Sequence, residues 1–191
     1  MNKQNGVIIA VSAPSGTGKT TIVKKILSDF PELVFSVSAT TRKKREYETE
    51  GIDYFFIPEE EFKAKIEKGE FIEWEKFYDY YYGTYKSYIE ENISNGKSVI
   101  IEIDVKGALQ LKKLYPDSVL IFIYPPSFDE LVRRLTNRQT ENETDLKKRI
   151  ERAKMELSLK DKFDYFIEND DLEKAISETE SLIEKIIYKE D

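Results

Sequence analysis

The segment at 13–20 constrains the fold of this chain more than any other part of the sequence. It reads Ala-Pro-Ser-Gly-Thr-Gly-Lys-Thr, follows a short apolar run at 7–11, and precedes a stretch at 21–27 with apolar residues at helical spacing. A buried strand, a glycine-containing turn and a helix in this order are typical of a phosphate-binding loop. Glycines let several backbone N–H groups point at one anion, and the helix N-terminus adds partial positive charge. The segment therefore predicts that the chain binds a nucleoside triphosphate.

Two side chains at the end of this loop have specific expected roles. Lys19 would reach the terminal phosphates, and the Thr20 hydroxyl would hold a magnesium ion. Ala13 stands where the generic pattern has glycine, so this residue must avoid positive φ. The alternative is a strand-to-helix turn without a ligand, although a Gly-Lys-Thr ending at a helix start has little purely structural use. The expected contacts to the triphosphate are Ala13, Pro14, Ser15, Gly16, Thr17, Gly18, Lys19 and Thr20.

Composition excludes several kinds of chemistry. The 191 residues include 30 Lys and Arg against 37 Asp and Glu, and this net charge of −7 argues against sequence-independent nucleic-acid binding. The chain has no cysteine and no histidine, so it cannot use a disulfide framework, a thiolate, a histidine relay or a zinc hydroxide. No apolar stretch approaches membrane-spanning length, and the run at 7–11 is too short for a signal peptide. We expect a cytoplasmic protein with no membrane partner.

Apolar runs and turn residues predict the secondary structure. Strands are expected at 7–12, 34–39, 53–57, 71–78, 98–103, 119–124 and 164–167. Continuous apolar runs separated by helices are typical of a parallel sheet covered on both faces, so the fold class is α/β. One helix runs from Pro58 to Gly69 and another from near Tyr85 to Gly96. Capping pairs open three more: Ser127 with Glu130, Thr140 with Glu143 before a basic stretch to Lys162, and Asp170 with Glu173.

The chain reads as a single domain with two appended parts, because no repeat or flexible tether divides it. The segment 34–82 is dense in strands and aromatic residues and suggests an inserted lobe, whereas 128–157 is polar and helical and suggests a mobile cover. The expected domain covers 6–187. Its parts are a core at about 1–36, 91–127 and 158–191, a lobe at about 37–90 and a lid at about 128–157.

Two arginines beyond an expected strand end point to a second anion site. Arg42 and Arg45 lie three residues apart and form a fork suited to a dianionic phosphate. If the pair stood alone, two exposed arginines on a loop would be the favoured interpretation.

Other motifs support the ligand interpretation. Ser-Val-Ser-x-Thr-Thr-Arg at 36–42, Phe-x-Glu-Trp at 71–74 and Tyr-Tyr-Gly at 81–83 occur in order, and the chain resembles guanylate kinase over nearly its whole length. The resemblance implies a P-loop NTPase fold, a three-layer α/β/α core with an inserted GMP-binding lobe and a helical lid. It also implies transfer of the γ-phosphoryl group of ATP to GMP with Mg²⁺, and leaves the use of dGMP open.

The resemblance further assigns residues to the acceptor nucleotide. Glu73 makes chemical sense as a guanine contact, because one carboxylate can accept both the N1–H and the exocyclic amine, whereas adenine would leave it facing an acceptor. From its residue type alone, Glu73 could equally be a surface charge on an alternating strand. The implied GMP phosphate contacts are Arg42, Arg45, Tyr54 and Tyr82. The implied guanine contacts are Ser38, Glu73 and Thr84, with Asp104 between the acceptor and the metal.

Phosphoryl transfer to an anionic phosphate needs no strong general base, so the lack of histidine fits this reaction. Positive charge should provide most of the catalysis. The implied catalytic set is Lys19, Arg42, Arg134, Arg138 and Arg149, with Asn169 near the adenine. Arg149 and Arg152 on the second lid helix could face Arg134 and Arg138 across the cover. The alternative is a solvated basic helix, which is expected for Lys147, Lys148 and Arg152.

Two other classes of protein remain as alternatives. A guanylate-kinase-like interaction module without catalysis should show an eroded phosphate loop, whereas Gly16, Gly18, Lys19 and Thr20 are intact here. A related kinase acting on a sugar bisphosphate would have no use for the guanine contacts. The sequence does not indicate the oligomeric state.

Overall fold

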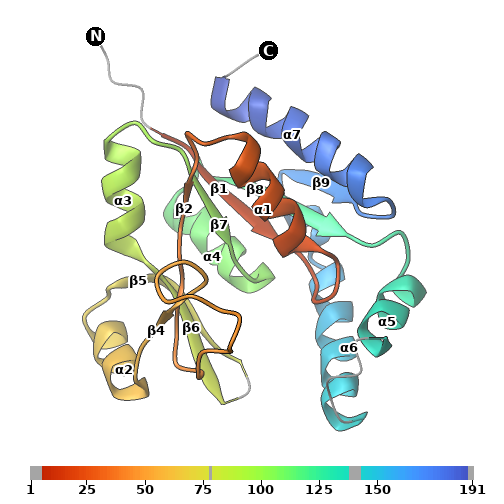
Figure 1. The fold of residues 1–191 in the computed structure, drawn as a ribbon, viewed down its shortest axis with the longest axis horizontal. Coiled ribbons are helices and arrows are strands. Elements are labelled where there is room, and N and C mark those ends of the chain that lie inside the picture. Colours follow the sequence, from red (N-terminus) through yellow and green to blue (C-terminus); the bar gives the residue numbers. More distant parts are fainter. Residues whose placement is uncertain (1–5, 78, 138–142, 189–191) are drawn as a thin grey trace.

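The computed structural model describes residues 6–77, 79–137 and 143–188. Its main sheet has five strands, all parallel, in the order β2-β7-β1-β8-β9 (Figure 1). In that order the strands are Val34–Phe35, Val99–Glu102, Ile8–Ser12, Val119–Tyr124 and Tyr165–Glu168. The predicted parallel α/β sheet is therefore confirmed.

Helices cover both faces of this sheet. Successive residues of its buried strands point to opposite faces and pack in two separate apolar cores. Ile9 of β1 packs with α1 (Lys19–Asp29) and α7 (Leu172–Tyr188). Its neighbour Ile8 packs in the second core with α3 (Lys86–Ser94) and α4 (Val105–Leu114). The result is a three-layer α/β/α core (Figure 1).

A second, smaller sheet lies beside the core and has the order β4-β3-β6-β5. These strands are Phe55–Phe56, Ala39–Thr40, Tyr80–Tyr85 and Phe71–Phe77, and helix α2 (Glu59–Glu67) packs against them. The aromatic rings of Phe62 and Phe71 stack at a centroid distance of 4.4 Å and form its centre. Gly83 faces these rings, and a Cβ there would lie 2.9 Å from the Phe62 ring, so a larger residue would force the rings apart.

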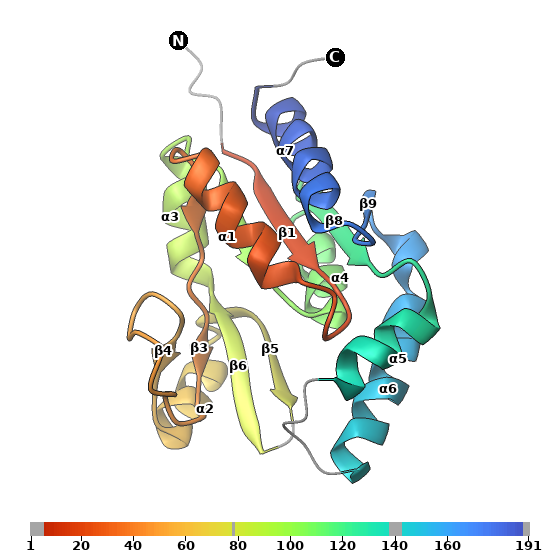
Figure 2. The same ribbon diagram turned by 45° about the vertical axis from the view of Figure 1, so that its right-hand side comes forward.

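Two further helices lie across from this second sheet. Helices α5 (Phe128–Thr136) and α6 (Glu143–Leu157) pack on each other through Leu131, Leu135 and Ala153. Figure 2 shows the end of β1 and the loop that follows it lying between this helix pair and the second sheet. The loop at 13–20 is thus flanked by both appended parts.

Several boundaries differ from those that the sequence predicts. The expected strand 34–39 is two strands in different sheets, because Ser36 N still donates to Ile100 O of the main sheet, whereas Ser38 O accepts from Phe55 N of the second. The basic helix ends at Leu157 rather than Lys162, and Lys160–Lys162 form a 3₁₀ turn. Strand β6 and helix α4 were not singled out from the sequence.

The capping predictions had mixed outcomes. Ser127 Oγ accepts from Glu130 N at 3.1 Å, as predicted. The C-terminal helix is capped by Asp171, one residue after the predicted Asp170, and its Oδ1 accepts from Lys174 N at 2.8 Å. Thr140 lies outside the described residues. In the described part of the chain, no helix is long and apolar enough to span a membrane.

Candidate active site

The loop at 13–20 joins β1 to α1 and has the backbone that its glycines predict. Gly16 and Gly18 have φ values of 93° and 85°, in the left-handed region that favours glycine. Gly18 is the N-cap of α1, so the loop ends at a helix N-terminus that attracts anions. The residue types and the backbone together fit a phosphate group.

Buried hydrogen bonds fix this loop from behind. Thr17 Oγ1 donates to Pro14 O at 2.9 Å, and Asn169 Nδ2 donates to Thr17 O at 2.6 Å. A Cβ on Gly18 would lie 2.7 Å from the same Asn169 nitrogen, so glycine is needed there for space as well as for φ. Asn169 therefore supports the loop directly, a role that the sequence did not predict.

A cavity of about 420 Å³ opens between the loop and the second sheet. The loop lines one wall, and Ser38, Tyr54, Glu73 and Tyr82 line the other. The cavity thus brings together the expected triphosphate contacts at 13–20, five of the expected GMP contacts (Ser38, Tyr54, Glu73, Tyr82 and Asp104) and Arg149. The structure also describes five expected site residues that do not line this cavity: Arg42, Arg45, Thr84, Arg134 and Asn169.

Glu73 is a buried carboxyl group, only 6% exposed. Its Oε1 accepts from Thr84 Oγ1 at 2.6 Å, and the two residues are cross-strand partners in β5 and β6. Burial raises the pKa of Glu73 to about 7, with smaller contributions from the nearby carboxylates, and the Thr84 hydrogen bond opposes this rise. The alternative interpretation of Glu73 as a surface charge on an alternating strand is therefore wrong, because its side chain is buried.

The N-terminal turn of α4 leaves room for this carboxyl group. Gly107 lies directly against it, and a Cβ there would be 2.9 Å from Glu73 Oε2. Asp104 caps the same helix, since its Oδ1 accepts from the backbone N–H of Lys106 at 2.8 Å and of Gly107 at 3.2 Å. The capped helix thus holds Asp104 beside Glu73 in the cavity.

Arg42 lies behind the cavity wall, where a carboxylate holds it. Its guanidinium donates to both oxygens of Glu48, with Nη1 to Oε2 at 2.6 Å, and its side chain is 10% exposed. It also lies 4.9 Å from the centroid of the Tyr54 ring, which lines the cavity. Hydrogen bonding to Arg42 lowers the pKa of Glu48 to about 2. The pair is therefore fully ionised at neutral pH, and the guanidinium is fixed behind the Tyr54 ring.

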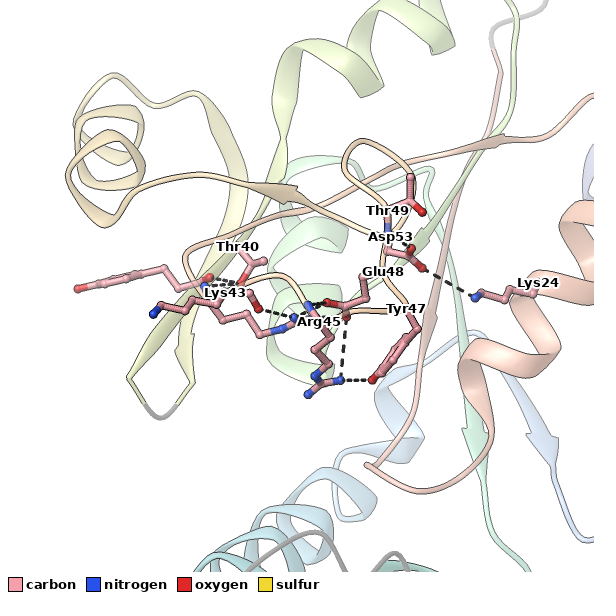
Figure 3. Close-up of polar contacts among 10 residues, drawn as sticks. Lys24, Thr40, Lys43, Arg45, Tyr47, Glu48, Thr49 and Asp53 are labelled. Atoms are coloured by element: carbon pink, nitrogen blue, oxygen red, sulfur yellow. Dashed lines mark hydrogen bonds and ion pairs between the residues drawn. The ribbon is translucent and has the colours of Figure 1, made fainter.

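Arg45 has a looser arrangement in the same loop. Figure 3 shows Arg45 and Tyr47 pointing toward each other beside Glu48, and Arg45 Nη1 donates to Tyr47 O–H at 2.9 Å. Its side chain is 59% exposed, whereas its backbone N–H donates to Glu48 Oε2 at 2.8 Å. The figure also shows Asp53 facing Lys24 of α1. Glu48 therefore organises both arginines, and the sequence did not identify it. Its spacing of three residues from Arg45 and six residues from Arg42 is the sequence signal that could have identified it.

Oxygen ligands suited to a magnesium ion gather at the end of β7. Thr20 Oγ1 donates to Glu102 Oε2 at 2.9 Å, and Asp104 lies two residues further along the chain. In the part of the chain that the structure describes, no group of three or more acidic side chains could hold a metal by itself. Mg²⁺ commonly uses one or two protein oxygens together with substrate phosphates and water, so these residues fit that ion.

The helix pair contributes arginines at different depths. Arg149 of α6 reaches the loop and donates to Ser15 Oγ. Arg134 of α5 donates to Glu130 at 2.7 Å and to the carbonyl of Asn169 at 2.9 Å, so here it supports the loop through Asn169. Arg138 lies outside the described residues.

One prediction about α6 is wrong. Arg152 is not solvated but lines the cavity, and its guanidinium donates hydrogen bonds to the carboxylates of Glu75 and Glu156. The sequence held a signal for this, because Arg149, Arg152 and Glu156 are spaced three and four apart and share one helical face. Glu75 likewise shares a strand face with Glu73.

The fold and the site define a class. A phosphate-binding loop follows the central strand of a parallel, three-layer α/β/α sheet, at the end where such sheets bind ligands. This arrangement is the P-loop NTPase fold, with a second sheet and a helix pair added around the loop.

Comparison with known proteins gives the particular family. The family model described as guanylate kinase matches residues 4–186. A guanylate kinase from Thermotoga maritima is 46% identical over 178 residues, which cover 93% of this chain and 86% of that protein. Another from Mycoplasma genitalium is 48% identical over 180 residues, or 93% of this chain and 75% of that protein. The crystal structure of guanylate kinase from Anaplasma phagocytophilum matches with a TM-score of 0.76 at 34% identity, covering 97% of this chain and 86% of that one. The chain belongs to the guanylate kinase family of nucleoside monophosphate kinases.

Proposed function

We propose that this protein transfers the γ-phosphoryl group of ATP to GMP and releases ADP and GDP. The observation that supports this most strongly is the position of Glu73. Its buried carboxyl group lies in the same cavity as the phosphate-binding loop, so a guanine bound to it would have its phosphate within the same enclosed space as the triphosphate. Holding two reactants in one cavity is the main requirement for a reaction without covalent chemistry by the protein.

The base would be read by hydrogen bonds from the second sheet. Glu73 would accept from the guanine N1–H and the exocyclic amine, and Thr84 would keep the carboxylate oriented through its 2.6 Å hydrogen bond. Ser38 lines the same wall and would complete the guanine contacts. Adenine would present an acceptor to the carboxylate and leave it unpaired, which can discriminate by roughly 10⁴.

The acceptor phosphate would be bound by tyrosines and arginines on that wall. Tyr54 and Tyr82 face the cavity, and Arg42 lies directly behind Tyr54. Arg45 is exposed and could reach the phosphate from the rim. Asp104 would lie between this phosphate and the metal.

The donor nucleotide would lie on the loop at 13–20, with Asn169 near its base. Lys19 and Ile103 both line the cavity, and Lys19 Nζ donates to Ile103 O at 3.3 Å. Thr20 would hold Mg²⁺ with Asp104 and Glu102 nearby, and the ion would neutralise charge on the phosphates. Arg134, Arg138 and Arg149 would supply further positive charge from the helix pair.

The proposed function also assigns roles to the appended parts. Within a domain spanning 6–187, the segment 37–90 is the GMP-binding lobe and 128–157 is the lid over the core. Such a protein would serve purine nucleotide metabolism in the cytoplasm, with ATP and GMP as its partners, and without nucleic acid or membrane partners.

A panel of acceptors tests the function directly. ADP formation is measured in a coupled assay with ATP, Mg²⁺ and GMP, dGMP, AMP, CMP or UMP in turn. We expect turnover with GMP and at least about 10³-fold lower kcat/KM with AMP, because the buried carboxylate rejects adenine. Equal rates with AMP and GMP, or turnover with none of the five, would refute the proposal.

A further inference from the structure

One guanidinium joins the lid helix, the GMP lobe and the core. Arg152 of α6 donates through Nη2 to Glu75 Oε2 of β5 at 2.6 Å and through Nε to Glu156 Oε1 of its own helix at 2.8 Å. The same Nη2 lies 3.9 Å from Oδ1 of Asp104, the capping residue of α4. These three carboxylates come from three separate elements of the fold.

The bonds are partly shielded from water and are therefore stronger than surface ion pairs. The side chains of Arg152, Glu75 and Asp104 are between 22% and 26% exposed, and that of Glu156 is 6% exposed. Burial alone would lower the pKa of the Arg152 guanidinium, but the hydrogen bonds to Glu75 and Glu156 outweigh it and raise that pKa. Partly buried, charge-assisted hydrogen bonds from a planar guanidinium fix the position of the carboxylates relative to it, and they are stronger than hydrogen bonds between neutral groups.

The two partners of Arg152 differ in what they constrain. Glu156 lies one turn along the same helix and orients the guanidinium. Glu75 lies in a strand of the other sheet, two residues from the guanine-reading position, and so fixes the distance between α6 and β5. Rotating either part away from the cavity must break this bond.

We propose that Arg152 is a positioning residue that fastens helix α6 to strand β5 through Glu75, so that the lid and the GMP lobe close as one unit. The proposal rests on the proposed function, because it takes these two parts to be the lid and the lobe of a kinase. Its expected consequence is that GMP, by drawing in the lobe, also brings Arg149 of the same helix to the donor phosphates.

A distance measurement without nucleotides tests the bridge itself. Because the chain has no cysteine, Glu67→Cys on α2 and Lys148→Cys on α6 provide two specific spin-label sites at exposed positions. We expect a narrow distance distribution in this labelled parent, and a longer and broader one after Arg152→Gln or Glu75→Gln. Lys154→Gln removes an exposed charge from the same helix and should leave the distribution unchanged. A parent-like distribution for Arg152→Gln would overturn the proposal.

Kinetics of the unlabelled variants test the effect on the reaction. Each single variant should raise the KM for GMP within the roughly 5- to 150-fold range of coupling between sites, with a smaller change in kcat. The double variant should be no worse than either single one, because both remove one bond. Two results would overturn the proposal, because either would mean that Arg152 acts on a nucleotide by itself. One is a KM for GMP in the double variant that reflects the sum of the two single effects, and the other is a raised KM in Arg152→Gln but not in Glu75→Gln. If no variant or parent phosphorylates GMP, the proposed function fails, whereas the distance measurement still reports the bridge.

Discussion

At the scale of single residues, Glu73 combines a cost in stability with a proposed benefit in recognition. A carboxyl group with a pKa near 7 instead of 4.5 holds its proton more tightly in the folded chain than in the unfolded chain. The folded state therefore loses stability as pH rises from about 4.5 to about 7. Residues kept at such a cost are typical of functional sites.

Glu73→Gln should separate these two effects. At pH 8 we expect the variant to have a free energy of unfolding higher than that of the parent by on the order of 1–3 kcal/mol, and therefore a higher unfolding temperature. At pH 4.5 the two proteins should differ little in stability. GMP binding should weaken by about 1–3 kcal/mol, because an amide offers one acceptor oxygen to two donors. Thermal unfolding and calorimetric titration measure the two effects, with exposed Glu67→Gln as the matched control. Unchanged GMP binding would remove Glu73 from the site.

The same pKa predicts a pH dependence for the parent. Only the ionised Glu73 can accept both guanine donors, so the Kd for GMP should fall as pH rises through about 7 and then level off. Titration calorimetry from pH 5.5 to 8.5 measures this, and Glu73→Gln should lack the step. A step that persists in the variant would assign the titration to another group.

Glu48 presents the opposite case, a carboxylate whose pKa of about 2 lies below its ordinary value. Its contribution to stability is present above pH 4.5 and is lost as pH falls toward 2. Glu48→Gln should destabilise the fold by about 1–3 kcal/mol at pH 7 and raise the KM for GMP, because Arg42 loses its two-point partner. Urea unfolding and initial rates measure both. Exposed Glu46→Gln is the control, and equal behaviour of the two variants would show that Arg42 needs no such support.

At the scale of elements, the phosphate-binding loop was fully predictable, because its conformation depends on its own glycines and on the adjoining strand and helix. Glu73 and Thr84 were assigned only through motif resemblance, since their contact depends on the register of β5 against β6. The split of 34–39 between two sheets could not be predicted, because it depends on pairing with residues far along the chain. The shared helical face of Arg149, Arg152 and Glu156 was a signal for the inward position of Arg152. Its partner Glu75 could not be predicted, because that contact depends on how α6 lies against β5.

Lys19→Ala tests the loop as an element. The lysine lies at the start of α1 on the donor side of the cavity, whereas the proposed GMP contacts lie on the second sheet. Turnover should fall by at least about 10²-fold while the Kd for GMP changes little. Steady-state rates and GMP titration distinguish the two parameters, and parent-like turnover would rule out the assigned role of the loop.

At the scale of the whole molecule, the second sheet and the helix pair lie on opposite sides of the phosphate-binding loop (Figure 2). Transfer between two nucleotides bound in the cavity beside this loop must exclude water. We expect GMP to bring the lobe toward the loop, together with helix α6 that Arg152 fastens to it, and ATP to complete the inward movement of Arg138 and Arg149. Small-angle scattering with and without GMP and a non-hydrolysable ATP analogue should show a smaller radius of gyration for the liganded protein. Identical scattering curves would exclude closure and leave the kinase assignment intact.

The most direct test of the account follows the phosphoryl group itself. The protein is mixed with Mg²⁺, GMP and ATP labelled at the γ-phosphorus, and the products are separated by chromatography. We predict that the label appears in GDP in a molar amount equal to the ADP formed, and that omitting GMP stops ADP formation. Label released as inorganic phosphate, at a rate that GMP does not change, would contradict transfer between two bound nucleotides.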